Sequence, residues 1–227
     1  MRKGPLGRWP FRSGLNEFAP DSLGEASHGV MEKPALPEHE ILDLLKRRWS
    51  PRAFSDKPVP EPILSRMFEA ARWAASSYNE QPWTYILGVK AEDTAEFDRI
   101  ASTLYPPNAW AKSAPVIALS VAKLKFSHDG SPNRVAIHDV GAASASLTLQ
   151  ALAEDVFVHQ MGGFDPKKAK ELFGIPDDYE AVAALAIGYP GDPEELPEAL
   201  KAREEAPRTR KKIEEFVFRG KWGGGRF

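Results

Sequence analysis

Apolar residues recur at helical spacing in several segments of the chain, and between these segments they form short continuous runs. The helical pattern predicts helices over residues 37–48, 60–75, 91–104, 133–154 and 165–174. The continuous runs predict strands over residues 83–90, 114–123, 156–160 and 181–191, the last one ending in a Pro–Gly turn. An apolar run without alternation is typical of a strand that is buried on both faces. The pattern therefore predicts one domain that contains both helices and strands.

The segment 133–154 is the longest predicted helix, and it contains six consecutive small residues, Gly141 to Ser146. Small side chains allow a second helix to approach closely. We expect this helix to pack against another one along that stretch.

Residues 1–36 show no such periodicity and are rich in Gly, Pro and Ser. We expect a flexible N-terminal extension over 1–36 and a single domain over 37–227, with Met31 as a possible alternative start. The first residues lack the apolar core of a signal peptide, and no window is long and apolar enough to cross a membrane. We therefore expect a cytoplasmic protein with no membrane partner.

The amino-acid composition excludes several kinds of site. The formal net charge of -2 offers no general attraction to nucleic acid, so any phosphate-binding charge has to be local. The chain has no cysteine, which excludes disulfides, thiolate nucleophiles and iron–sulfur clusters. The five histidines show no metal-ligand spacing, and we predict no metal site. His138 and Asp139 are adjacent, and we interpret them as a surface pair.

The motif RRWSPRAF begins at Arg47, where the first helical pattern ends. Arg48 and Arg52 flank Ser50, and Pro51 breaks the helix between them. Guanidinium groups bind phosphate oxygens in pairs, and a hydroxyl adds a further hydrogen bond. The alternative is a basic helix end exposed to solvent, or a kinase substrate site.

Three further stretches carry hydrogen-bonding groups at chain turns. SSYNEQPW (76–83) offers hydroxyls and amides to a planar heterocycle, or it is an ordinary capped turn. The pair Gly162–Gly163 follows a predicted strand and lets backbone N–H groups approach a ligand, although a tight turn also needs such glycines. The basic run 208–212 is either a second phosphate contact or an exposed face.

Taken in order, these stretches resemble the FMN-dependent nitroreductase family. The matching segments are RRWSPRAF, SSYNEQPW, NAWAKSAPV, HQMGGFDPKKAKELFGIP and RTRKKIEEFVF, which together span about residues 37–222. The resemblance implies an α+β fold, a three-layer α/β/α sandwich around a mixed, mainly antiparallel sheet. It also implies a homodimer with FMN bound at the subunit interface and a C-terminal arm that reaches the partner subunit.

The resemblance assigns roles to particular positions. Arg48, Ser50 and Arg210, with Arg208 as a companion and Trp49 inside the motif, match residues that hold the FMN phosphate and ribityl chain. Arg52 matches a basic residue near the pyrimidine end of the flavin, and Asn108 matches an asparagine at the pyrimidine edge. Gly162 and Gly163 match the loop whose amide faces flavin N5. Ser76, Ser77, Asn79 and Gln81 match the stretch that the partner contributes. Ser146 stands where the family often has asparagine.

The implied activity is hydride transfer from NADH or NADPH, through flavin N5, to a nitroaromatic, a quinone or a similar small oxidant in a ping-pong cycle. No side chain has to act as acid or base, and we predict no catalytic residue. The alternatives are a flavin-binding or storage protein without turnover, and a specialised dehalogenase-like or flavin-fragmenting enzyme of the same fold. A non-flavin phosphate or nucleic-acid binder is a further alternative.

Overall fold

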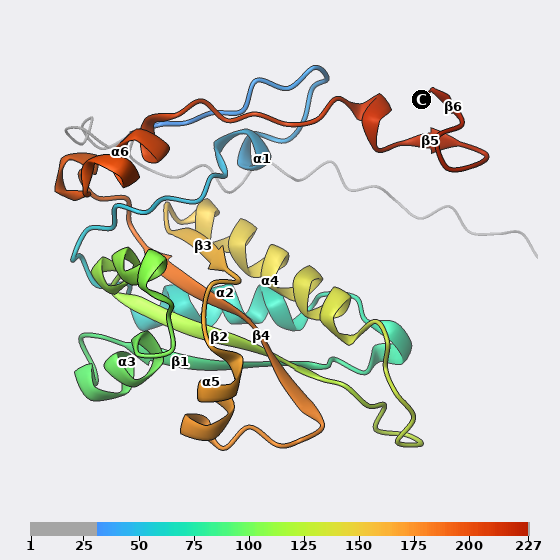
Figure 1. Cartoon of the computed structure of the whole chain (residues 1–227), viewed down its shortest axis with the longest axis horizontal. Helices are drawn as coiled ribbons and strands as arrows, with labels where there is room; N and C mark the ends of the chain where they lie inside the picture. Colours follow the sequence, from blue (N-terminus) through green and yellow to red (C-terminus); the bar gives the residue numbers. More distant parts are fainter. Residues whose placement is uncertain (1–30, 227) are drawn as a thin grey trace, which may run out of the picture.

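The computed structural model describes residues 31–226, and a four-stranded sheet lies at the centre of this part of the molecule (Figure 1). Its strands are β1 (Trp83–Val89), β2 (Val116–Lys123), β3 (Phe157–Met161) and β4 (Tyr179–Gly188), in the spatial order β1-β2-β4-β3. Each of the three pairings is antiparallel. The predicted α+β class is confirmed, and the parallel pairing of a mixed sheet is not present between the described strands.

Helices cover both faces of this sheet, so the expected three layers are present. One face is covered by α2 (Glu61–Arg72) and α4 (Ala136–Ala153), which also pack against each other. The other face is covered by α3 (Thr94–Ala101), α5 (Pro166–Phe173) and the 3₁₀ helix η2 (Pro106–Ser113).

Strand β2 shows why its apolar run is continuous. Ile117 and Leu119 point into the cluster under α3 and α5, whereas Val116 and Ala118 point into the cluster under α2 and α4. All four side chains are 0% exposed. A strand buried on both faces needs apolar residues at every position, as the sequence pattern predicted.

The small-residue stretch of α4 is only partly covered within the chain. Ala143 packs in the cluster formed with α2, which confirms the close helix contact, but Gly141 and Ala145 are exposed on the opposite side. Ser146 donates its hydroxyl to the carbonyl oxygen of Ala142 at 3.2 Å, within its own helix.

The helix predicted over 37–48 is wrong in extent, because α1 comprises only Asp43–Arg47. It has no buried residue, and Leu42 just before it is 72% exposed. Short helices depend on packing for their stability, and this segment has too little apolar contact to extend further. Residues before it run extended, with the Ala35 N–H donating to the Lys46 carbonyl oxygen at 2.8 Å.

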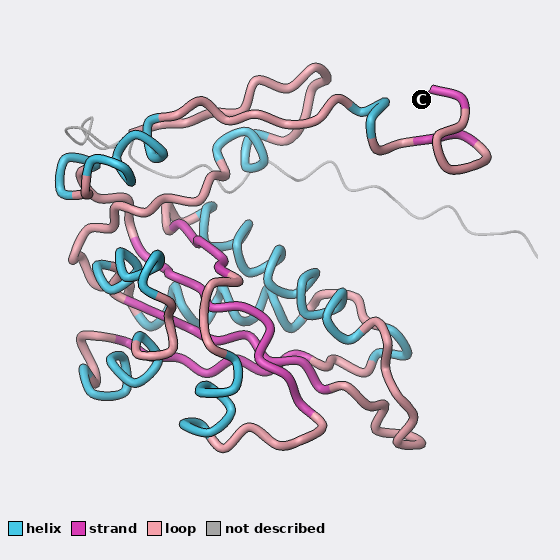
Figure 2. The backbone as a smooth tube through the Cα atoms, viewed as in Figure 1, coloured by secondary structure: helices cyan, strands magenta, loops and turns pink. Residues whose placement is uncertain are grey.

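The last part of the described chain lies apart from the sheet. It contains η3 (Pro193–Glu195), α6 (Glu198–Glu205), η4 (Ile213–Glu215) and a two-stranded hairpin of β5 (Phe218–Arg219) and β6 (Gly225–Arg226). The sequence pattern did not predict α6. The tube in Figure 2 shows the chain after α6 running beside the segment that precedes α1, with the hairpin at the far end of this arm. Among residues 31–226, no helix is both long and apolar enough to span a bilayer.

Candidate functional site

Arg48 contacts Ser50, and the charges of two arginines from the other end of the chain, Arg208 and Arg210, act on it. Arg48 donates from Nη1 to the Ser50 hydroxyl at 3.2 Å. Burial lowers the pKa of Arg48, and the nearby charges of Arg208 and Arg210 lower it further. Within residues 31–226, no carboxylate forms an ion pair with any of these three arginines. Clustered guanidinium groups without a protein counter-charge are typical of a site that binds an anion.

Arg208 is fixed in this cluster by backbone contacts. Its Nη1 donates to the carbonyl oxygens of Lys33 and Lys46, both at 2.8 Å. Burial lowers its pKa, and the neighbouring charge of Arg210 adds to the effect. Lys46 lies two residues before Arg48, so Arg208 is held close to the RRWSPRAF motif. A shared phosphate site of Arg48, Arg208 and Arg210 stays a prediction.

A pocket of about 240 Å³ opens next to the cluster. Arg48, Ser50, Thr148 and Gln160 supply its polar groups, and Leu45, Ala145, Leu149 and Val158 supply its apolar lining. Gln160 donates to the Thr148 hydroxyl at 3.3 Å. A mostly apolar cleft with a few polar groups suits an aromatic ligand with a charged end, but ligand sites usually measure roughly 300–1,000 Å³. One chain therefore supplies only part of a site for a ligand of that size.

A second cavity is larger, about 600 Å³, but it holds neither Arg48 nor Ser50. Trp49 lies in its wall, 5% exposed, and packs edge-on against Phe157 at 6.0 Å between ring centroids. The side chain of Trp49 therefore lies on a different side of the motif from the Ser50 hydroxyl. The larger cavity lacks the arginine and serine that could bind a phosphate, so the smaller pocket beside Arg48 is the candidate site.

The glycine loop after β3 is tied to η2. The Gly163 carbonyl oxygen accepts from the Tyr105 N–H at 3.1 Å and from Asn108 Nδ2 at 2.9 Å. A Cβ on Gly163 would lie 2.3 Å from Asn108 Nδ2, whereas a Cβ on Gly162 would meet nothing within 4 Å. The end of the Asn108 side chain occupies the Cβ position of Gly163, so two of the sequence-predicted positions form one local structure.

His159 connects this loop to the arginine motif, and the sequence analysis had assigned it no role. Its Nδ1 lies 2.7 Å from the Pro51 carbonyl oxygen, and its ring is 4.5 Å from that of Trp110. Burial, with the charges of Arg52 and Arg48, lowers the pKa of His159 to about 4. The ring is therefore neutral at pH 7, and Nδ1 carries the proton that it donates to Pro51.

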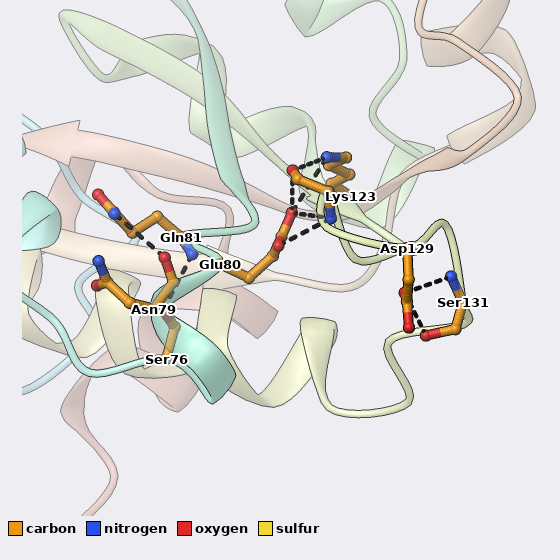
Figure 3. A network of polar contacts seen from close by, with 8 residues as sticks. Ser76, Asn79, Glu80, Gln81, Lys123, Asp129 and Ser131 are labelled. Atoms are coloured by element: carbon orange, nitrogen blue, oxygen red, sulfur yellow. Dashed lines mark hydrogen bonds and ion pairs between the residues drawn. The ribbon is translucent and has the colours of Figure 1, made fainter.

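The turn Ser76–Gln81 has an unusual backbone. Tyr78, Asn79 and Gln81 have φ angles of 53°, 54° and 52°, in a region that non-glycine residues seldom occupy. Ser76 accepts a hydrogen bond from the Gln81 N–H at 3.0 Å, as Figure 3 shows. Positive φ angles at consecutive residues are retained only where surrounding contacts hold them.

Glu80 is one of those contacts, and it is anchored in the network shown in Figure 3. Its carboxylate accepts from the Ser127 hydroxyl at 2.6 Å, from the Ser127 N–H, and from Lys123 Nζ at 3.1 Å. These bonds, that of the Ser127 hydroxyl first, hold the pKa of Glu80 at about 2.

Asp139 holds the other side of the same turn. Its Oδ2 accepts from the Ser77 N–H at 3.0 Å, and the residue is only 5% exposed. The interpretation of His138–Asp139 as a surface pair is therefore wrong for Asp139, because its carboxylate is buried against the turn. His138 itself is exposed and lies 3.2 Å from Asp139 Oδ1.

The turn and the arginine cluster lie at different places along α4. The turn contacts Asp139 near the start of the helix, whereas the pocket beside Arg48 contacts Thr148. At 1.5 Å per residue these two positions are about 14 Å apart along the helix axis. Within one chain, the structure does not bring Ser76, Ser77, Asn79 and Gln81 to the arginines.

Glu204 is a further residue that the sequence analysis missed. It lies in α6, is 0% exposed, and accepts from the backbone N–H groups of Arg52 and Ala53. Both Glu204 and Glu205 lie in one run of charged residues, and the sequence does not indicate that Glu204 is buried and Glu205 exposed. Gln160 and Thr148 were missed for a similar reason, because their neighbourhood depends on the packing of β3 against α4.

A three-layer α+β fold with Arg48 and Ser50 in a pocket and a glycine loop after β3 is typical of proteins that hold a phosphorylated cofactor against a sheet. Residues 45–189 match the Nitroreductase family model, and the chain belongs to this family.

Relatives and solved structures agree with this membership. A solved FMN-containing oxidoreductase is 34% identical, with a TM-score of 0.78 over 83% of this chain and 96% of that one. A putative NADH dehydrogenase/NAD(P)H nitroreductase from Archaeoglobus fulgidus is 28% identical over 70% of this chain and 91% of its own length. A 5,6-dimethylbenzimidazole synthase from Rhodobacter capsulatus is 27% identical over 69% of this chain and 86% of its own length. The expectation of an FMN- and NAD(P)H-dependent oxidoreductase is confirmed at the level of the family.

Proposed function

We propose that this protein is a homodimeric FMN enzyme that passes a hydride from NADH or NADPH to a small oxidant such as a nitroaromatic or a quinone, in a ping-pong cycle. The observation that supports it best is the contact of Arg48 with Ser50, with the charges of Arg208 and Arg210 nearby and no carboxylate paired to these arginines in the described part of the chain. The terminal phosphate of FMN fits this chemistry, because its oxygens accept from guanidinium and hydroxyl groups.

The remaining site residues fit the rest of the cofactor. The apolar side of the pocket, with Leu45, Leu149 and Val158, suits a planar ring. At Gly162 nothing lies within 4 Å of the Cβ position, so its backbone is open to a ligand. When bound, FMN supplies a hydride acceptor and donor at N5. Arg52 brings positive charge to the region where the reduced ring is more negative.

The protein needs no acid or base of its own for this exchange. NADH or NADPH delivers one hydride, which is two electrons with one proton, and leaves as the oxidised nucleotide. The oxidant then takes up the two electrons with protons. His159 is held neutral with its Nδ1 proton donated to Pro51, which agrees with a role in holding the site rather than in proton transfer.

A homodimer would complete the site. The pocket in one chain is small, the turn Ser76–Gln81 lies away from it, and the exposed Gly141 and Ala145 leave a flat side on α4. The arm after α6 runs away from the sheet and carries Phe216 and Trp222, 59% and 93% exposed. A second copy packed on α4 would cover these groups and bring its own Ser76, Ser77, Asn79 and Gln81 to the cofactor.

The visible absorption spectrum and an anaerobic stopped-flow experiment test the proposal. We expect purified protein to carry FMN and to lose its flavin absorbance on mixing with NADH or NADPH, and to regain it when a quinone or nitroaromatic is added. A flavin-loaded protein that neither nicotinamide reduces would indicate storage instead. Colourless protein that takes up no FMN would contradict the proposal.

The relative named as a 5,6-dimethylbenzimidazole synthase raises a second candidate, a reaction in which the flavin itself is consumed. Product analysis by mass spectrometry after reduction in air separates the two. Intact FMN after many turnovers supports the reductase, and stoichiometric loss of FMN supports the second candidate. The cytoplasmic location and the division into residues 1–36 and 37–227 stay predictions, and residues 1–30 lie outside the described part.

A further inference from the structure

The short segment Pro51–Ala53 is held from two directions by side chains that are distant in sequence. On one side, His159 of β3 donates from Nδ1 to the Pro51 carbonyl oxygen at 2.7 Å. On the other side, Oε1 of Glu204 in α6 accepts from the Arg52 N–H at 2.6 Å and from the Ala53 N–H at 3.1 Å. The backbone that carries Arg52 is therefore fixed independently of its guanidinium group.

Glu204 also faces the charge of Arg52. Its Oε2 lies 3.4 Å from Arg52 Nη1, and its backbone carbonyl oxygen accepts from Lys33 Nζ. The Glu204 side chain is 0% exposed, whereas that of Arg52 is 26% exposed. A buried carboxylate is tolerated only where hydrogen bonds and cations surround it, and here two backbone N–H groups and the Arg52 guanidinium do so.

The position of the Arg52–Glu204 pair determines how strongly its charge can act on a bound flavin. Arg52 follows Ser50 by two residues, and Ser50 lines the pocket together with Arg48, so the Arg52–Glu204 pair lies next to that pocket in the chain. Burial lowers the pKa of His159 and Lys33, and the charge of Arg52 lowers both further. A cation close to a flavin favours its reduced, more negative form. The part of the Arg52 charge that Glu204 balances is not available to the flavin.

We propose that Glu204 is a positioning residue that fixes Arg52 and, by partly balancing its charge, sets the reduction potential of the bound FMN. This inference rests on the proposed function, because it requires FMN beside Arg52. It concerns a residue outside the sequence motifs, in a helix that joins the sheet to the arm with Arg208 and Arg210.

The experiment measures the FMN midpoint potential by anaerobic spectroelectrochemistry in the wild type, Glu204→Gln and the matched control Glu205→Gln. Glutamine keeps a carbonyl oxygen for the two backbone donors but lacks the charge. We expect the potential of Glu204→Gln to become more positive and that of Glu205→Gln to equal the wild type. An unchanged or more negative potential in Glu204→Gln would overturn the inference.

A second pair of variants separates an effect through Arg52 from a direct effect of Glu204 on the flavin. If Glu204 acts through Arg52, the potential of Arg52→Gln falls below the wild type, and adding Glu204→Gln to it causes no further change. A shift between the single variant and the double variant contradicts the inference. Arg52→Gln leaves the buried Glu204 carboxylate without its guanidinium, whereas the double variant leaves no unpaired buried charge. If a single variant does not fold, the double variant is therefore compared with the wild type: its potential should be lower, because the Arg52 charge is lost, and an equal potential contradicts the inference.

Failure of the inference and failure of the proposed function give different results. Wild-type protein that binds no FMN, or whose FMN is not reduced by NADH or NADPH, contradicts the proposed function. Wild-type protein that does both, with the same potential in Glu204→Gln, contradicts only the role of Glu204.

Discussion

Asn108 Nδ2 donates to the Gly163 carbonyl oxygen at 2.9 Å and occupies the space that a side chain at position 163 would need. This contact joins η2 to the loop that follows β3. Substitution of Gly163 should therefore disturb this contact, whereas a Cβ on Gly162 would meet nothing within 4 Å.

Gly163→Ala is expected to push Asn108 away, because the new Cβ would lie 2.3 Å from its Nδ2. The displaced group is the end of a flexible side chain, so the expected cost is that of its lost hydrogen bond to Gly163, about 0.5–1.5 kcal/mol. Thermal unfolding should show a lower midpoint, and fluorescence titration should show weaker FMN binding. Gly162→Ala is the matched control and should leave the unfolding midpoint near the wild-type value. Equal midpoints in the two variants would show that the loop adapts freely.

Arg48→Gln should weaken FMN binding by roughly ten- to a hundredfold, because a hydrogen bond to a charged group contributes about 1.5–3 kcal/mol. Riboflavin lacks the phosphate, so its affinity should change much less. The exposed Arg203 provides the matched control as Arg203→Gln. If Arg48→Gln weakened both ligands equally, the arginine cluster would not be the phosphate site.

Glu80→Gln should destabilise the turn Ser76–Gln81, since it removes the charge that Lys123 and Ser127 bind. The expected loss in the free energy of unfolding is about 1–3 kcal/mol at neutral pH. Urea unfolding measures it, and the exposed Glu92→Gln is the control. If the turn serves the cofactor of a partner subunit, FMN affinity should fall as well.

Stability should decrease as the pH falls from 6.5 towards 4, and His159 should account for part of the decrease. Its pKa is about 4 in the folded chain and 6.5 in the unfolded chain, so only the unfolded chain takes up the proton in this window. The full contribution, about 3 kcal/mol, is present above pH 6.5 and is lost towards pH 4.

His159→Gln keeps a donor for Pro51 and does not titrate, so its unfolding free energy should change less across this pH window than that of the wild type. His39→Gln, at an exposed position, should follow the wild-type curve. Parallel curves for the wild type and His159→Gln would refute the assignment.

Gly141→Arg should convert the proposed homodimer into a monomer, because a long charged side chain would stand on the exposed small face of α4. The position itself is open, with nothing within 4 Å of a built Cβ, so the fold should persist. Light scattering after size exclusion measures the mass. Ala95→Arg on the exposed side of α3 is the control and should leave the mass unchanged.

The strands could be predicted from the sequence because burial on both faces leaves a signal at every position of β2. The arginine motif could also be recognised, since Arg48 and Ser50 lie two positions apart. The length of α1 could not be predicted, because its apolar spacing is helical but Ile41 and Leu45 are exposed, 37% and 39%, in the folded chain. Burial, and not spacing, decides whether such a helix extends.

The residues that escaped the sequence analysis depend on contacts between distant segments. Glu204 and Glu205 are identical in sequence terms, and only the packing of α6 against residues 52 and 53 distinguishes them. Asp139 was misread as a surface residue because its partner, the Ser77 N–H, belongs to a turn 62 positions earlier. Every residue except proline has a backbone N–H group, so the sequence does not show which of these groups a buried carboxylate will bind.

The proposed phosphate site combines Arg48 with Arg208 and Arg210, and all four strands of the central sheet precede Arg208 in the chain. During synthesis these strands therefore leave the ribosome before Arg208 and Arg210 do. Under the proposed function, full binding of the cofactor phosphate is therefore expected only at the end of synthesis. A chain that ends before Arg208 would contain the central sheet and the helices that cover it, but it would lack two of the three arginines of the proposed phosphate site.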